Sequence, residues 1–133
     1  IKFINTEYLM AKPKKSLSQN FLIDKNISKK IVNQTVVKGQ KILEIGPGYG
    51  FLTDSILEKN PKKVYLIEKD FNLKKILIKK YKDNKKVNII GYDIFLTNLS
   101  EFKNLIIISN LPYNISSKII LYLFNYKENI NEM

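Results

Sequence analysis

The sequence predicts an α/β protein in which helices flank a parallel β-sheet. Short runs of β-branched and other apolar residues alternate along the chain with segments of helical periodicity. Each run is too apolar to have one face in water, which is typical of strands that helices cover on both sides. A glycine-rich turn follows the first run, where a parallel sheet presents its backbone to a ligand. At 133 residues, the chain is expected to form one domain.

The expected elements follow from these runs and from the residues that interrupt them. Four apolar runs are predicted as strands, at residues 42–45, 64–67, 87–90 and 105–108. Apolar residues spaced three and four apart predict helices at residues 24–36, 51–59, 70–81 and 116–126. Asp24 and Asp70 are the predicted N-caps of two of these helices. Residues 1–18 show no period and are expected to form a mobile basic arm, and a polar tail follows the last helix.

Three of the predicted helices have one apolar face that we expect to be buried. In chain order, these faces consist of Ile27, Ile31 and Val32; then Leu73, Ile76, Leu77 and Tyr81; then Ile119, Ile120, Leu123 and Phe124. Lysines occupy the other face of the helix at 70–81 and the loop after it, and we interpret them as a solvated face. They are Lys74, Lys75, Lys79, Lys80, Lys82, Lys85 and Lys86.

The composition excludes several kinds of chemistry. The chain has no cysteine and no histidine, so thiolate chemistry, the usual proton shuttle and the commonest metal ligands are absent. We therefore expect no metal site. No apolar run is long enough to cross a membrane or to form a signal peptide, so we expect a soluble protein. The 23 basic residues, all lysine, and 12 acidic residues give a net charge of +11, which favours a polyanionic partner. A general bias towards Lys, Ile and Asn is the alternative explanation.

The glycine-rich turn has the pattern G-x-G-x-G, with glycines at positions 46, 48 and 50. Glycine lets the chain turn sharply and lie close to a ligand without a Cβ in the way. The dinucleotide pattern G-x-G-x-x-G requires a third glycine at position 51, where this chain has Phe51. The turn therefore favours a ligand other than NAD.

Polar residues follow each of the four predicted strands, at the edge where open α/β sheets bind ligands. Glu44 and Gly46 lie at the first exit, Glu68 at the second and Asp93 at the third. Glu68 lies 22 positions beyond Gly46, close to the roughly 20 expected of an acid that binds ribose hydroxyls. Asp93 can accept a hydrogen bond from an adenine amino group. Because the glycine turn has no phosphate-binding lysine, we predict a ligand with an adenosine but no pyrophosphate, which describes S-adenosylmethionine.

Each of these residues also has an ordinary explanation. The glycines alone predict a tight turn, Glu68 alone a solvated strand end, and Asp93 alone a turn residue. Their order at consecutive strand exits is what favours a binding site.

The fourth exit, residues 110–113, has the sequence Asn-Leu-Pro-Tyr and predicts the reaction. An adenine amino group is a poor nucleophile because its lone pair is delocalised into the ring. The side-chain oxygen of Asn110 and the carbonyl of Pro112 can accept its two hydrogens, and Tyr113 can stack on the base. Methyl transfer to such an amine depends mainly on positioning and needs no histidine or metal. A proline-containing turn after a buried strand is the alternative.

In these motifs the chain resembles the rRNA adenine dimethyltransferases, which modify two adjacent adenosines of small-subunit rRNA. The matching segments are L-S-Q-N-F-L-I-D, E-I-G-P-G-Y-G-F-L-T, I-E-K-D, G-Y-D and N-L-P-Y-N-I-S-S. The resemblance implies a Rossmann-like class I S-adenosylmethionine-dependent methyltransferase fold. It implies target-adenine contacts at Asn110, Pro112 and Tyr113. It implies cofactor contacts at Asn20, Leu22, Gly46, Glu68, Asp93 and Asn110.

The resemblance also implies rRNA of the small subunit as partner, a cytoplasmic or organellar location, and a monomer in the full-length form. By the resemblance, further strands and a helical rRNA-binding domain would follow this segment, whereas this sequence ends at Met133. We therefore expect a truncated sheet of four strands, with residues 105–108 as an unpaired hydrophobic edge that favours association. Both a fragment of a longer protein and a truncated product are consistent with this.

Two other functions stay open. Macrolide-resistance methyltransferases of large-subunit rRNA resemble the chain in most of the same motifs, although Leu22 to Asp24 and Leu111 favour the small-subunit type. A non-catalytic RNA-binding assembly protein that kept the fold is the second alternative.

Overall fold

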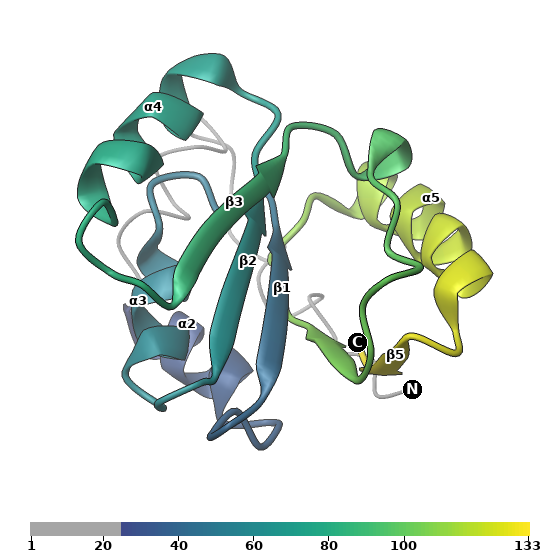
Figure 1. The fold of residues 1–133 in the computed structure, drawn as a ribbon, viewed down its shortest axis with the longest axis horizontal. Coiled ribbons are helices and arrows are strands. Elements are labelled where there is room, and N and C mark those ends of the chain that lie inside the picture. Colours follow the sequence, from purple (N-terminus) through teal and green to yellow (C-terminus); the bar gives the residue numbers. More distant parts are fainter. Residues whose placement is uncertain (1–24) are drawn as a thin grey trace.

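The computed structural model describes residues 25–133, which form a five-stranded sheet with the strand order β3-β2-β1-β4-β5 (Figure 1). All four neighbouring pairs run parallel. The strands are β1 (Lys41–Ile45), β2 (Lys63–Ile67), β3 (Val87–Gly91), β4 (Leu105–Ile107) and β5 (Ile130–Glu132). The predicted parallel α/β architecture is therefore confirmed.

Helices cover both faces of this sheet (Figure 1). They are α2 (Lys25–Val32), α3 (Phe51–Leu57), α4 (Phe71–Lys80) and α5 (Tyr113–Leu123), with short 3-10 turns η2 (Ile94–Leu96) and η3 (Phe124–Tyr126). Helices α2, α3 and α4 lie on one side of the sheet and α5 lies on the other (Figure 1). Among the described residues, no helix is long and apolar enough to span a membrane.

The sheet separates two hydrophobic cores. Alternate residues of β1 point to opposite faces, so Ile42 packs with α2, α3 and α4, whereas Leu43 packs with α5. Neither side chain has any exposed surface. Burial on both faces explains why neighbouring positions of the strand are both apolar and do not simply alternate with polar residues.

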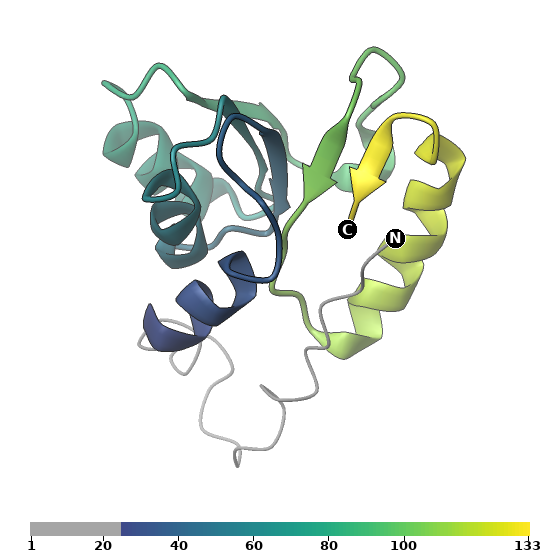
Figure 2. The same cartoon turned by 90° about the horizontal axis from the view of Figure 1, so that it is seen from below.

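The prediction that residues 105–108 form an unpaired edge is wrong, because the segment expected to be a polar tail contains β5. Leu105 pairs with Ile130 in parallel register, and the Leu105 N–H donates to the Asn129 carbonyl at 2.9 Å. Thr35 Oγ1 also donates to Glu132 Oε2 at 2.5 Å, which fixes the strand from a second direction. Figure 2 shows β5 beside β4, with α5 running alongside. Three residues, of which only the first is apolar and buried, are too few for a periodic signal.

Two helix boundaries and some expected core positions differ from the predictions. Helix α2 ends at Val32, and Val36 is 73% exposed, because a turn follows where four more helical residues were expected. Helix α5 begins at Tyr113, three residues earlier than predicted, directly after a proline that fixes the backbone. Ile76 and Phe124, expected in the core, are exposed. Figure 1 shows α4 beside β3, on one side of the sheet. Only one face of this helix can therefore pack against the sheet.

Candidate functional site

A pocket of about 360 Å³ lies at the carboxyl ends of the strands and brings together several predicted site residues. It contains Gly46 from the first strand exit, Glu68 from the second, and Asn110 and Pro112 from the fourth. Its other lining residues are Ser28, Glu44, Pro47, Gly48, Tyr49, Phe51, Leu52, Leu73 and Leu111. The volume and the mixture of apolar walls with a few polar groups suit a small organic ligand.

The glycine turn is a tight loop whose backbone requires glycine at three positions. Gly46, Gly48 and Gly50 have φ values of 68°, 60° and 89°, in the left-handed region that other residues rarely adopt. The Gly46 N–H donates to the Ile67 carbonyl at 2.9 Å. A Cβ at Gly46 would lie 3.2 Å from Leu111 Cδ2, so the loop closely approaches the β4 exit.

Glu68 is buried and holds this loop against the start of α4. One carboxylate oxygen accepts the Gly48 N–H at 3.0 Å, and the other accepts the Asp70 N–H at 2.9 Å. Its side chain is therefore not a solvated strand end. Two oxygens provide about four acceptor directions, so bonds to two backbone groups leave capacity for ligand hydroxyls. Asp70 itself accepts from Asn72 and Leu73 and is the N-cap of α4, as predicted.

A cluster of polar groups at the end of α4 holds the same loop from its other side. The Tyr81 hydroxyl lies 2.6 Å from Asp54 Oδ1 and 3.0 Å from the Gly50 carbonyl oxygen. Lys80 Nζ donates to Asp54 Oδ2 at 2.7 Å and to the Tyr49 carbonyl at 3.1 Å. Burial, followed by the hydrogen bond to Asp54, raises the pKa of Tyr81, so the phenol keeps its proton and acts as a donor.

Glu44 is a buried carboxyl group at the base of the pocket. Its Oε2 accepts from Thr53 Oγ1 at 2.6 Å. Burial raises the pKa of Glu44 to about 8, against the lowering effect of that hydrogen bond. The group is therefore largely protonated at neutral pH and contributes little negative charge to the pocket.

Asn110 is the residue of the site with an unsatisfied polar atom. Its Oδ1 is buried and has no hydrogen-bond partner among the described residues. The neighbouring Ser109 fixes the start of this loop, because its Oγ accepts the Ile45 N–H at 2.9 Å. A buried acceptor without a donor costs roughly 1–3 kcal/mol, so such an atom needs an explanation. A ligand that brings an N–H group into the pocket provides one.

Pro112 lines the pocket and is the N-cap of α5, whereas Tyr113, the first residue of that helix, is not among the lining residues. The Pro112 carbonyl accepts the N–H groups of Ile115 at 3.1 Å and Ser116 at 3.0 Å, in the first turn of the helix. Of the two acceptors predicted from the sequence, the Asn110 oxygen is therefore the one without a donor among the residues described. The Tyr113 side chain is 67% exposed, which leaves its ring free to stack.

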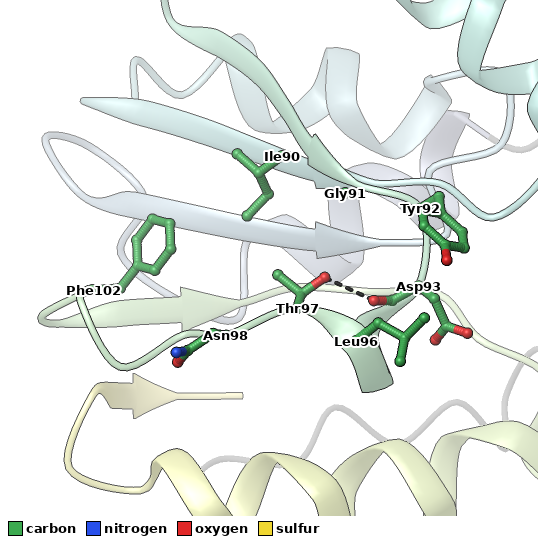
Figure 3. Close-up of a pocket in the computed structure, with 8 residues that line it drawn as sticks. All are labelled: Ile90, Gly91, Tyr92, Asp93, Leu96, Thr97, Asn98 and Phe102. Atoms are coloured by element: carbon green, nitrogen blue, oxygen red, sulfur yellow. Dashed lines mark hydrogen bonds between the residues drawn. The ribbon is translucent and has the colours of Figure 1, made fainter.

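Asp93 does not line this pocket. It lies in a neighbouring hollow of about 400 Å³, between the end of β3 and the turn η2 (Figure 3). Asp93 Oδ1 accepts the Phe95 N–H at 3.0 Å and caps η2, and Thr97 Oγ1 donates to the Asp93 carbonyl at 2.7 Å. The other carboxylate oxygen of Asp93 lies 3.8 Å from the Nζ of Lys69, the residue that follows Glu68 in the sequence. A bound molecule would have to occupy both hollows to reach Glu68 and Asp93.

Some predicted residues lie outside the described part of the chain, and others were missed. Asn20, Leu22 and the predicted cap Asp24 fall before residue 25. Ser28 and Leu73 line the pocket, but a lone serine and a lone leucine on amphipathic helices carry no signal of binding. Within residues 25–133, no group of three or more acidic residues is placed to hold a metal ion.

The fold is that of a class I S-adenosylmethionine-dependent methyltransferase domain. The structure is similar to that of the 23S rRNA methyltransferase ErmE, with a TM-score of 0.70 and 22% identity over 80% of this chain and 43% of that one. It is also similar to a dimethyladenosine transferase from Plasmodium falciparum, with a TM-score of 0.64 and 26% identity over 80% of this chain and 39% of that one.

The chain belongs to the ribosomal RNA adenine dimethylase family, whose sequence model matches residues 10–133. It is 42% identical over 125 residues to ribosomal RNA small subunit methyltransferase A of Hydrogenobaculum sp., covering 93% of this chain and 48% of that protein. It is 49% identical over 112 residues to the protein of the same name from Mesomycoplasma hyopneumoniae, covering 84% and 42%. The chain thus spans about half the length of the curated relatives it matches.

Proposed function

We propose that the protein containing this chain uses S-adenosylmethionine to dimethylate the exocyclic amine of two adjacent adenosines in small-subunit rRNA. The observation that carries this proposal is the buried Asn110 oxygen beside the glycine turn, which has no hydrogen-bond partner within residues 25–133. This oxygen can accept a hydrogen bond from an amino group of a ligand. It lies in the same pocket as the glycine turn, whose backbone can approach a ligand closely. The names of the relatives, which are small-subunit rRNA methyltransferases, support the substrate.

Residues of three strand exits would hold the cofactor. Gly46 allows the backbone to approach it, and Glu68 has acceptor capacity for its ribose hydroxyls. Asp93 is the proposed partner of its adenine, and Asn20 and Leu22 are proposed contacts by resemblance to the family. When bound, S-adenosylmethionine supplies an electrophilic methyl group. These residues fix its position relative to the fourth strand exit.

The fourth exit would hold the target base. Asn110 Oδ1 accepts a hydrogen from the adenine amine and turns the nitrogen lone pair out of conjugation with the ring. Tyr113, exposed at the start of α5, stacks on the base and fixes its plane. Pro112 shapes the turn that presents both groups, in addition to its carbonyl contacts with α5. Positioning of this kind is the main contribution a protein makes to a direct displacement.

The first experiment measures cofactor binding by calorimetry in Glu68→Ala and Asp93→Ala variants. Both are expected to bind S-adenosylmethionine more weakly, while an Asp83→Ala variant, altered at an exposed acid outside the site, is expected to bind as the unmodified chain does. Unchanged affinity in both variants would contradict the proposed cofactor site. Because Asp93 and Glu68 line different pockets, loss in one variant alone would identify which pocket holds the ligand.

The second experiment separates the proposed substrate from the alternatives. Incubation with ribosomal subunits and labelled cofactor, followed by mapping, should place two methyl groups on each of two adjacent adenosines of the small subunit. Methylation of large-subunit rRNA would favour the macrolide-resistance type, whose fold this chain shares. Binding of rRNA without any methyl incorporation would favour a non-catalytic assembly role.

A further inference from the structure

We propose that the outer face of helix α4 binds single-stranded RNA next to the target site. This face consists of Phe71, Lys75, Ile78, Lys79 and, in the turn after the helix, Lys82, and we call it the α4 basic face. The inference rests on the proposed function in taking RNA as the substrate. It adds a surface of this chain that would hold that RNA.

The periodicity of the helix places these residues on one side. They follow one another at spacings of four, three, one and three positions, which form a continuous stripe on an α-helix. All five are exposed, whereas Leu77 and Tyr81 point the opposite way and are buried. The stripe therefore points away from the sheet. Figure 1 shows α4 as the outermost element on its side of the molecule.

The three lysines of this face form no ion pair within residues 25–133. Helix α4 contains no acidic residue, and the ion pairs of residues 25–133 are Lys69 with Asp93 and Lys80 with Asp54. Lys80 points inward to the glycine turn and is paired. Lys75, Lys79 and Lys82 point outward and have no such partner in the described chain. Like charges at this spacing destabilise a helix slightly, and phosphate groups of a nucleic acid would relieve that repulsion.

An exposed aromatic ring at the start of the face favours a single strand. Phe71 is 69% exposed, and the Lys75 ammonium lies 4.5 Å from its ring centroid. A solvated lysine face does not explain a phenyl group in water. Aromatic rings that stack on unpaired bases, combined with lysines that follow the backbone, are how proteins bind single-stranded nucleic acid.

The position of Phe71 connects this face with the target site. Phe71 lies three residues beyond Glu68, at the exit of β2, and β1 alone separates β2 from β4. Strands lie about 4.8 Å apart, so the exits of β2 and β4 are roughly 10 Å apart. One RNA strand with a base at Asn110 can therefore also reach the α4 basic face.

The test is the binding of a single-stranded RNA oligonucleotide to the full chain carrying Lys75→Gln, Lys79→Gln and Lys82→Gln together. Each lost phosphate contact lowers the slope of log affinity against log salt by about 0.7, so the slope should fall by about 2. At 0.1 M salt, this corresponds to a loss of affinity of roughly 100-fold. Cofactor affinity, measured in parallel, should stay unchanged, which shows that the variant is folded.

The matched control replaces three other exposed lysines, Lys62, Lys103 and Lys127, which precede β2, β4 and β5 at the opposite edge of the sheet. It has the same net charge as the first variant. We expect it to retain most of the RNA affinity and of the salt slope. Equal losses in the two variants would overturn the proposal, because net charge alone would then explain the binding.

A Phe71→Leu variant tests the aromatic contribution. It should weaken binding to single-stranded RNA by at least about fivefold and leave binding to duplex RNA unchanged, because paired bases offer no free face to the ring. An equal effect on both would contradict a single-strand surface. All these assays measure binding without methylation. A failure of the proposed catalytic function would therefore leave RNA binding intact, whereas a failure of this inference would leave cofactor binding and methylation intact.

Discussion

The loops after β1 and β4 meet in the same pocket but are held in different ways. The β1 loop is fixed by Glu68 on one side and by Tyr81 and Lys80 on the other. The β4 loop is fixed at its start through Ser109 and at its end through the Pro112 carbonyl, and between them the Asn110 oxygen has no partner among residues 25–133. Among the described residues, the first loop therefore has its polar groups bound by the protein, whereas the second keeps one buried acceptor for the proposed ligand.

This contrast fits two halves of a transfer reaction. A donor loop that needs no further contacts is preorganised, and its rigidity costs nothing at the moment of reaction. We call the β4 loop the acceptor loop, because its buried Asn110 oxygen is proposed to bind the amino group of the substrate adenine. Changes in the first loop should therefore affect stability and cofactor affinity, and changes in the second should affect turnover.

The largest expected effect belongs to the acceptor loop. Asn110→Ala should lower kcat for adenosine methylation by roughly 100-fold, the scale seen when one preorganised polar group is removed from a reacting centre. Its free energy of unfolding should stay level or rise, since the variant removes an unsatisfied buried oxygen. Asn114→Ala, at an exposed position in the first turn of α5, is the control and should be close to unchanged. A large loss of stability in Asn110→Ala would break the contrast between the loops.

The next effect belongs to the donor loop. A Cβ at Gly50 would lie 2.4 Å from the Tyr81 hydroxyl, in addition to the strain of φ at 89°. Gly50→Ala should therefore destabilise the protein by about 3 kcal/mol in urea unfolding, the sum of a backbone and an overpacking cost. Gly39→Ala has similar backbone strain with no atom within 4 Å, and it should cost only about 1 kcal/mol. Equal costs would show that the Tyr81 contact does not constrain the loop.

A smaller effect is expected for the hydroxyl that holds the donor loop. Tyr81→Phe removes the contacts with Asp54 and with the Gly50 carbonyl, and should cost about 1–2 kcal/mol of stability. It should weaken cofactor binding several-fold with little change in kcat. Tyr126→Phe, which loses a hydroxyl contact on the α5 side of the sheet, should leave cofactor affinity unchanged. A fall in kcat with unchanged affinity would contradict the assignment of Tyr81 to the donor loop.

The smallest effect concerns pH. Burial raises the pKa of Glu44 to about 8, above its unfolded value near 4.5, so the folded state binds this proton more tightly than the unfolded state does. The resulting stability is complete at low pH, declines as pH rises above about 4.5, and is lost above about 8. Between pH 7 and 9 the decline should be about 1 kcal/mol. In urea unfolding measured at both pH values, Glu44→Gln should abolish this decline in the free energy of unfolding. Glu58→Gln, at an exposed position, should show the same decline as the unmodified chain.

The sequence predicted the sheet and most of the pocket because those features have local signals. The strands are largely apolar runs; Gly46 and Glu68 directly follow β1 and β2, and Asn110 lies three positions after the end of β4. Parallel strands must bring such residues to a common edge. The parallel sheet could therefore be predicted from the spacing of apolar residues along the chain, and the pocket from the positions of the polar residues after the strands.

The remaining features depend on contacts between distant residues. Tyr81 fits an apolar helical face, and nothing nearby indicates that its hydroxyl reaches Gly50, 31 positions earlier. The pairing of β5 with β4 is likewise set by three residues near the end of the chain. Asp93 follows its strand as expected, yet it caps a 3-10 turn and faces another hollow. Side-chain direction after a strand exit is decided by the loop, which periodicity does not describe.

Helix α4 connects these observations, because both of its ends contact the donor loop. The residues before its first turn bind Gly48 through Glu68, and its last turn binds the loop through Lys80. Its outer side is the surface proposed for RNA. If RNA binds there and shifts or stiffens this helix, we expect the free energy of cofactor binding to change. Thermodynamic linkage then requires the cofactor to change the RNA affinity by the same factor. Binding of each substrate would thus change the affinity for the other, and α4 would transmit the effect.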